Sequence, residues 1–249
     1  MGFEIALAIV GGLIAIVGVY ACVVSVWLAV KYVKFNRTQN SAGLSGEEVA
    51  RKILDSNDLK HIKVKVTGSL LFGNSYSHYF KKVRLRRFTR HKQSLTSLGM
   101  GAQKASLAIL DKEGDPDMKK RVRLYPLVTF GPFAFVPLLI IGALLDYFVF
   151  SQSGVLVLVL GGLGFLFFVY SLILSVLMLK TEKKAQKKAY EVLEKQGLAN
   201  AEELAKLKEL FHLYNVQYVN DIILSALELI YVAIEIMSMV QGNSSSSSK

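Results

Sequence analysis

The chain has 249 residues, of which 52% are hydrophobic, and its mean hydropathy is +0.39. An ordinary soluble enzyme of this length does not need so much apolar surface, so the composition excludes that class. The formal net charge of +11 indicates attraction to anionic partners. Cys22 is the only cysteine in the sequence, which excludes an intrachain disulfide.

Four apolar runs account for the excess, and each is long enough to cross about 30 Å of hydrocarbon as a helix. They predict a transmembrane anchor at 1–30, a transmembrane helical hairpin at 124–180 and a fourth transmembrane helix at 220–241. The first run has no positively charged start and no small-residue cleavage site, so we expect it to remain as an anchor. The predicted fold class is therefore mostly α and integral to the membrane, with about four transmembrane helices.

The polar segments between these runs contain nearly all of the basic residues. Of the 30 Lys and Arg, 29 lie between residues 31 and 123 or between 180 and 208. Because Lys and Arg near the ends of membrane helices resist translocation, we expect a multi-pass protein of the cell membrane with most of its polar chain in the cytoplasm. The sequence predicts a basic domain at 31–123, cytoplasmic helices at 181–219 and a disordered Ser-rich tail at 242–249.

The segment 31–123 has the pattern of a small α+β domain. Ser45 and Glu48 have the spacing of a capping box, which predicts a helix from Gly46 to Asp55. A second helix is predicted over 94–114, where small and aliphatic residues interrupt an otherwise basic segment. Ser106 in this helix has no identifiable base that would make it a nucleophile, so it is interpreted as a mark of close helix packing.

Two strands are predicted in the same domain, at 62–66 (IKVKV) and 81–86 (KKVRLR), because apolar and basic side chains alternate there. One face of the strands is expected to enter a core: Ile62, Val64, Val66, Val83 and Leu85. The other face is a ribbon of cations: Lys63, Lys65, Lys82, Arg84 and Arg86. We expect the ribbon to bind anionic lipid headgroups, or else an acidic protein or peptide. Nucleic acid is not expected, because aromatic platforms for bases are too few.

The order of these elements carries a resemblance. The resemblance rests on three features: the stretch GLSGEEVARKILDSNDLKHIKV at 43–64, the DKEG at 111–114 that ends the second predicted helix, and the spacing of the membrane segments. In these features the chain resembles the bacterial membrane-embedded neutral zinc metallopeptidases over nearly its whole length. The resemblance implies a small zincin-like cytoplasmic domain between the first and second transmembrane helices, with the active-site helix at 94–114.

The chain departs from that family at the chemistry. Such proteins carry H-E-x-x-H on this helix, where two imidazoles hold zinc and the glutamate between them acts as general base. By the resemblance, the two histidine positions and the glutamate position correspond here to Gln103, Leu107 and Lys104. The third ligand position is kept as Glu182. One carboxylate does not make a zinc site, so we expect no metal, no other cofactor and no catalytic residue; zinc is expected only if this interpretation of the motif is wrong.

Lys104 suggests how such a site could hold together without zinc. A buried carboxylate needs a partner, so we predict an ion pair or a near approach between Lys104 and Glu182. The alternative places Lys104 in solvent and pairs Glu182 with Lys183 or Lys187 on its own helix.

Two further residues, Tyr76 and His78, lie in the stretch NSYSHYF, where the resemblance places a polar turn on the substrate side of a groove. No partner for the histidine can be named from the sequence. A solvent-exposed turn histidine is therefore the simpler interpretation of His78.

Asp221, Glu228 and Glu235 recur every seven residues along the fourth apolar run, which places them on one helical stripe. Acids within a membrane are costly and often belong to a proton or cation path. The simpler interpretation puts the outer two at the membrane interfaces and only Glu228 deep. In that case we expect it to be hydrogen-bonded to a neighbouring helix through Ser171, Ser175 or Tyr170.

Three functions are compatible with the sequence. The first is a non-catalytic pseudo-peptidase of the membrane that binds a membrane or peptide partner at the cytoplasmic face. The second is an active membrane zinc metallopeptidase with atypical ligands. The third is a small transporter component that uses the intramembrane acids. We favour the first, because it explains a preserved architecture together with a dismantled ligand set.

Overall fold

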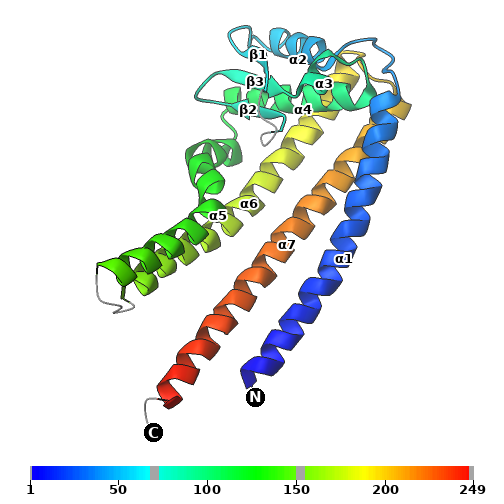
Figure 1. Cartoon of the computed structure of the whole chain (residues 1–249). Helices are drawn as coiled ribbons and strands as arrows, with labels where there is room; N and C mark the ends of the chain where they lie inside the picture. The colour runs from blue at the N-terminus through cyan, green and yellow to red at the C-terminus, as the bar shows by residue number, and fades with distance from the viewer. Residues whose placement is uncertain (1, 68–72, 150–154, 247–249) are drawn as a thin grey trace. The chain divides into compact units, whose positions relative to one another are not determined.

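The computed structural model describes residues 2–67, 73–149 and 155–246 (Figure 1). The chain divides into two compact units. Unit 1 comprises Met1–Ser25, Leu124–Val176 and Val216–Lys249, and unit 2 comprises Val26–Arg123 and Leu177–Asn215. Each unit is therefore built from segments far apart in the sequence.

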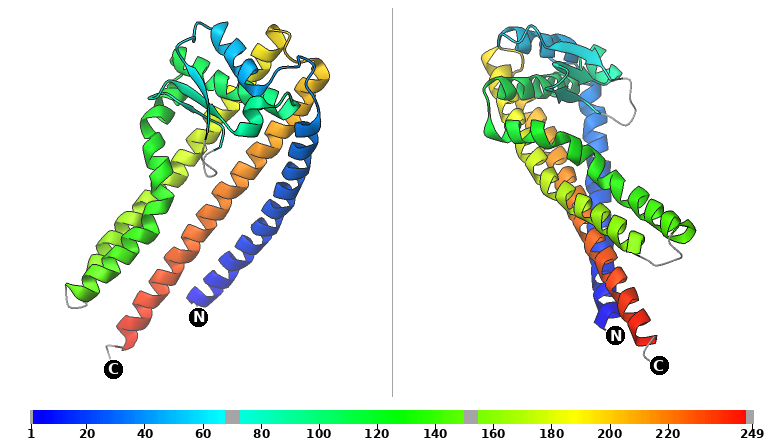
Figure 2. Two further views of the ribbon diagram at one scale, coloured as in Figure 1. Left: turned by 45° about the horizontal axis from the view of Figure 1, so that its top comes forward. Right: turned by 90° about the vertical axis from the view of Figure 1, so that its left-hand side faces the viewer.

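Unit 1 is made of the apolar parts of four long helices: α1 (Gly2–Arg37), α5 (Pro116–Phe148), α6 (Val155–Lys195) and α7 (Ala201–Ser246). Helices α1 and α7 lie side by side. Ser25 Oγ donates a hydrogen bond to Gln217 Oε1 at 2.8 Å, and the ring of Tyr231 lies against Gly11. Helices α5 and α6 also run alongside each other in this unit (Figures 1 and 2).

Two of the described helices are long and apolar enough to cross a membrane, namely Gly2–Arg37 and the part Val159–Lys195 of α6. Only 11% and 22% of their most apolar windows are buried. These two helices expose apolar side chains along their length, among them Ile16, Val19, Leu166 and Ile173. A core helix of a soluble protein would instead be mostly buried.

The other two expected transmembrane segments stay predictions. The run after residue 124 is helical, but its side chains at 125–136 lie outside the described part of the chain. The fourth run lies within α7, and this helix is continuous from the polar segment to Ser246. A disordered tail was expected at 242–249, and in the structure 242–246 continue helix α7; 247–249 lie outside the described residues.

Unit 2 contains α2 (Gly46–Asp55), which begins with the predicted capping box. Ser45 Oγ accepts a hydrogen bond from the backbone of Glu48, and the Glu48 carboxylate accepts one from the backbone of Ser45 at 2.7 Å. Helix α3 (Arg87–His91) is a single short turn that the sequence analysis did not predict, and it leads into α4 (Leu95–Lys112). The predicted helix at 94–114 is therefore confirmed to within two residues at each end.

The sheet of unit 2 has three strands in the order β1-β3-β2: β1 (Lys63–Val66), β2 (Ser75–Ser77) and β3 (Lys82–Leu85). Strand β1 runs parallel to β3, and β2 is antiparallel to β3. Strand β2 was not predicted, because three residues with two serines give no apolar alternation. The expectation for Val66 was wrong: it is 36% exposed, since β1 is an edge strand and this is its last residue.

Helix α4 is the centre of unit 2, and every residue from Leu95 to Leu110 is buried. On one side it packs so closely on α2 that a Cβ atom added to Gly101 would overlap the carbonyl oxygen of Gly46. On another side Gly99 lies against Leu207 and Phe211 of α7. The small residues of the 94–114 segment are thus explained by two close helix contacts.

Candidate functional site

Three side chains from two helices surround the carboxylate of Glu182 in unit 2. Lys104 Nζ and Gln103 Nε2, both from α4, donate to Glu182 Oε2 at 2.8 Å each. Arg121 Nη2, from the polar start of α5, donates to Glu182 Oε1 at 2.7 Å. The expected contact between Lys104 and Glu182 is present, and the alternative pairing of Glu182 with Lys183 or Lys187 is not what the structure has.

The position of each side chain follows from its helix. Gln103 and Lys104 lie in the middle of the buried helix α4, where a lysine without an acid would be costly. Glu182 lies on α6 three residues beyond Leu179, where the apolar run ends and the polar part of the helix enters unit 2. Lys104 is 8% exposed and Arg121 is 9% exposed. The site is therefore an interhelical ion cluster largely shielded from water.

Arg121 was missed by the sequence analysis, because it lies in the basic stretch KKRVR with nothing to distinguish it by type. Helical spacing gives a signal: Arg121 follows Met118 by three residues, and Met118 is buried. Lys119 and Lys120 between them are exposed. A basic run with one member on an apolar helical face therefore indicates a buried cation.

Two opposing effects set the ionisation of Glu182. Burial by itself raises the pKa of this carboxyl, but the Lys104 and Arg121 cations together outweigh it and lower the pKa to about 2. The carboxylate is thus ionised at neutral pH. With two cations and one anion, the cluster has a net charge of +1.

We expect acid to weaken unit 2 through this carboxylate. Because the folded pKa of about 2 lies below the ordinary value of 4.5, the stabilisation is fully present above pH 4.5 and is lost as the pH falls towards 2. The difference between the folded pKa and the ordinary pKa corresponds to a stabilisation of unit 2 by about 3 kcal/mol. The measurement is the free energy of unfolding against pH for wild type and Glu182→Gln. The difference in free energy of unfolding between the two proteins should shrink only as the pH falls from 4.5 towards 2. A difference that does not change with pH would contradict the lowered pKa of Glu182.

The residues of the cluster do not fit a zinc ion. Zinc needs electron-pair donors, whereas Lys104 and Arg121 offer only N–H groups and positive charge. Both oxygens of Glu182 already accept hydrogen bonds, and Leu107 has no ligand atom and lies in the hydrophobic core. Within residues 2–67, 73–149 and 155–246, no group of three His, Cys, Asp or Glu side chains is placed to hold a metal ion.

A second polar cluster lies further along α4. Asp111 Oδ2 accepts a hydrogen bond from Tyr76 Oη at 2.7 Å and contacts His78 Nδ1 at 2.6 Å. Lys81 Nζ lies 4.0 Å from the same oxygen. Burial and the Asp111 carboxylate both raise the pKa of the Tyr76 phenol above its ordinary value. His78 lies in a turn with its side chain 37% exposed, as expected, but it also has a partner, Asp111, which the sequence could not name because it is distant along the chain.

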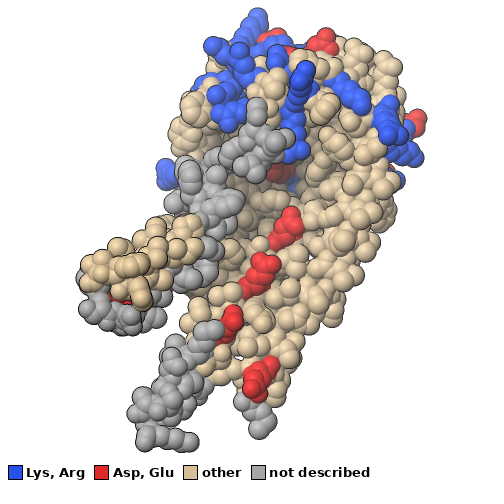
Figure 3. All heavy atoms as spheres, viewed as in Figure 1, with Lys and Arg blue, Asp and Glu red and all other residues tan. Residues whose placement is uncertain are grey.

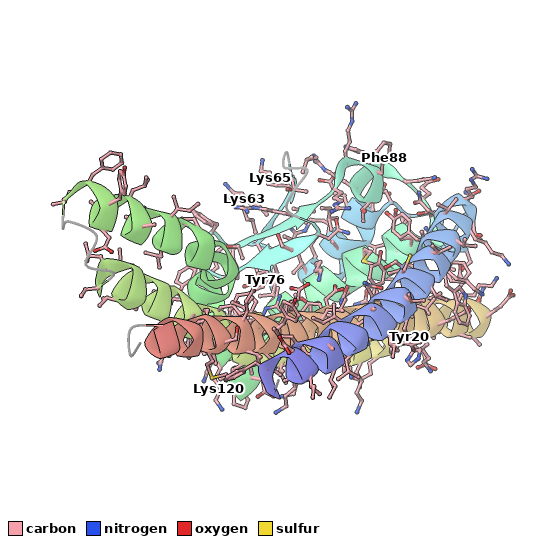
Figure 4. The ribbon with its side chains drawn as sticks, turned by 60° about the horizontal axis from the view of Figure 1, so that its bottom comes forward. Tyr20, Lys63, Lys65, Tyr76, Phe88 and Lys120 are labelled. Carbon is pink, nitrogen blue, oxygen red and sulfur yellow. The ribbon has the colours of Figure 1, made fainter. Side chains whose placement is uncertain are left out.

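Among the described residues, the part of α4 beside Tyr76 is covered. Tyr76 is only 8% exposed, and the helix beneath it is buried from Leu95 to Leu110. His78 lies at the edge of the cluster, with its side chain 37% exposed. Figure 4 shows Tyr76 on the inner side of the sheet. Tyr76 and His78 therefore connect the sheet to α4 through Asp111.

Further ion pairs attach the polar part of α6 to the turn between α4 and α5 and to the first turn of α5. Lys184 bridges Asp115 and Asp117 at 2.7 and 2.6 Å, Lys180 lies 3.1 Å from Asp117, and Lys188 lies 2.6 Å from Glu113. The Lys184 and Lys180 ammonium groups lower the pKa of Asp117. The polar part of α6 is thus held within unit 2 by several ion pairs besides the one at Glu182.

The acids of α7 are separate from this cluster. Asp221 accepts a hydrogen bond from Gln217 at 2.9 Å, Glu228 is exposed and Glu235 is half-buried. The expected hydrogen bond of Glu228 to α6 is absent among the described side chains, and Ser175 donates to the backbone of Ser171 instead. Figure 3 shows acidic side chains spaced along an otherwise uncharged surface.

Comparison with known proteins agrees with the order of the elements. The family model described as "Putative neutral zinc metallopeptidase" matches residues 10–237. The chain is also similar to "Putative membrane protease YugP" of Bacillus subtilis (strain 168), with 27% identity over 210 residues, which are 84% of this chain and 82% of that protein. No solved structure matches the chain. The chain therefore belongs to the neutral zinc metallopeptidase family.

Proposed function

We propose that this chain is a non-catalytic member of the neutral zinc metallopeptidase family. The observation that carries the proposal is the occupation of both Glu182 oxygens by cationic or amide donors, at the place where the family's chemistry needs metal ligands. By the family resemblance, Gln103, Lys104 and Leu107 stand at the H-E-x-x-H positions. An ammonium group cannot accept a proton from a metal-bound water, so the general base is missing as well.

The ion cluster takes over the structural part of the zinc ion's role in this proposal. A zinc ion would link the active-site helix to the helix of the third ligand. Lys104 and Arg121 make the same kind of link, since they connect α4 and α5 to Glu182 on α6. The peptidase frame is thereby kept without the metal.

The chain is proposed to be a multi-pass protein of the cell membrane, with unit 2 in the cytoplasm. The two apolar helices of membrane length and the similarity to a protein named as a membrane protease support the membrane location. The Lys and Arg that follow the apolar part of α1 (Lys31, Lys34 and Arg37) support the orientation. With α4 enclosed, a protein or peptide partner would bind to the outer surface of unit 2.

The test is the zinc content of the detergent-purified full chain, measured by elemental analysis. We expect no stoichiometric zinc in wild type. We expect zinc to be acquired by the variant that restores the motif, Gln103→His, Lys104→Glu and Leu107→His, with Glu182 as the third ligand.

The matched control adds Glu182→Ala to the restored variant, which should abolish zinc binding because only two imidazoles remain. Stoichiometric zinc in the wild-type protein, lost on Glu182→Ala alone, would overturn the proposal and favour an active metallopeptidase with atypical ligands. Failure of the restored variant to bind zinc while folded, even after Arg121→Met frees Glu182 Oε1, would show that residues 103–107 are not the H-E-x-x-H positions.

A further inference from the structure

The outward face of the sheet in unit 2 carries cations in register. Lys63 on β1 lies opposite Lys82 on β3, and Lys65 lies opposite Arg84. On the other side of β3, Ser77 lies opposite Lys82 and Ser75 lies opposite Arg84. The three strands thus present two ranks, each with two cations and one hydroxyl, which we call the basic sheet face. Figure 4 shows Lys63 and Lys65 projecting from β1 on the same side.

The charge of the basic sheet face is not balanced from within the described chain. Lys63, Lys65, Lys82 and Arg84 form no ion pair with a described carboxylate, whereas Lys180, Lys184 and Lys188 on α6 each have one. Like charges directly opposite each other across a pair of strands repel and destabilise the sheet. An arrangement of this kind becomes favourable when an anion lies over both ranks.

An aromatic ring adjoins two of these cations. The Phe80 ring lies 4.4 Å from Lys82 Nζ and 5.7 Å from the guanidinium carbon of Arg84. Phe80 is 67% exposed, so its ring is open to solvent beside the two cations. A large exposed aromatic side chain beside cations suits the boundary between phosphate headgroups and acyl chains, where one part of the surface is charged and the other is apolar.

We propose that the basic sheet face binds the headgroups of anionic phospholipids. Four uncompensated cations and two hydroxyls match phosphate oxygens in charge and in hydrogen-bonding type. The same chain has two helices of membrane length, and Lys and Arg are concentrated over unit 2 (Figure 3). Nucleic acid fits less well, since the sheet itself carries no aromatic platform and the exposed Phe80 ring lies at its margin. The inference does not depend on the loss of zinc.

The test is lysine footprinting of the full chain in lipid nanodiscs. The protein is placed in nanodiscs of phosphatidylcholine alone or of phosphatidylcholine mixed with phosphatidylglycerol, and acetylation of each lysine by a water-soluble reagent is followed by peptide mass spectrometry. With phosphatidylglycerol, Lys63, Lys65 and Lys82 should react roughly fivefold more slowly. The exposed lysines Lys52 and Lys60 of the same unit serve as internal controls and should react equally in both lipids.

Salt and a matched pair of variants complete the test. Protection should disappear at high ionic strength, because exposed charges are then screened. Native mass spectrometry should detect fewer bound phosphatidylglycerol molecules after Lys63→Gln, Lys65→Gln, Lys82→Gln and Arg84→Gln. The control variant has the same change of charge elsewhere: Lys52→Gln, Lys60→Gln, Lys187→Gln and Lys195→Gln. Equal acetylation in both lipids would overturn the proposal, as would protection by added RNA or acidic peptide but not by phosphatidylglycerol.

Discussion

Replacing Glu182 with alanine is expected to lower the free energy of unfolding of unit 2 by about 3 kcal/mol. The substitution removes the only anion of the cluster and leaves Lys104 and Arg121, which are 8% and 9% exposed, without a carboxylate. A buried cation without a partner costs more than the hydrogen bonds that are lost. Chemical unfolding of the detergent-purified protein, followed by circular dichroism, measures the change.

The control for this prediction is Glu191→Ala, since Glu191 is an exposed acid on the same helix, and its loss should change stability by less than about 0.5 kcal/mol. Adding Lys104→Met and Arg121→Met to Glu182→Ala should restore much of the stability, because the orphaned cations are then gone. If Glu182→Ala is as mild as the control, the cluster is not the link that holds α4, α5 and α6 together.

The second large effect is expected for Gly101→Ala, which should lower the free energy of unfolding of unit 2 by about 3 kcal/mol. The added methyl group would overlap the backbone of Gly46, and backbone atoms at a helix crossing cannot move aside as a side chain can. Unit 2 would have to separate α2 from α4, the two helices that form its centre. The same unfolding measurement in detergent detects the loss.

Two other glycines provide matched comparisons. Gly99→Ala meets the end of the Leu207 side chain at 2.5 Å, which can change rotamer, so its cost should be smaller, about 1 kcal/mol. Gly12→Ala in α1 has nothing within 4 Å and should stabilise the helix by about 0.5 to 1 kcal/mol. Equal effects at Gly99 and Gly101 would show that the contact between α2 and α4 can open at little cost.

Local elements of unit 2 were predictable because their signals are local. The capping box at Ser45 and Glu48 fixes the start of α2, and alternation fixes β1 and β3 to within one residue at each end. Strand β2 and helix α3 have three and five residues, too few for a periodic pattern, and their neighbours in space are β3 and α4. Tertiary contacts therefore decide the short elements.

The candidate site was predicted in part. Lys104 and Glu182 could be named through the family resemblance, which places them at a motif position and at the third ligand position, and a buried carboxylate at such a position needs a partner. Arg121 could have been singled out by its helical spacing from Met118, but its partner Glu182 could not be assigned to it, and Asp111 could not be matched with His78, since these contacts depend on how α4, α5, α6 and the sheet pack. Such pairings are distant in sequence and leave no periodic trace.

The sequence by itself determined the apolar runs, the concentration of cations between them and the absence of imidazoles from the 94–114 helix. These properties depend only on residue type and order. Tertiary structure alone decided that the helix is enclosed on its sides by α2 and α7, and that Arg121 joins Lys104 at Glu182. It also decided that four cations lie in register on an open sheet face. The physical reason is that burial and charge pairing are set by neighbours in space, which the order of residues does not specify.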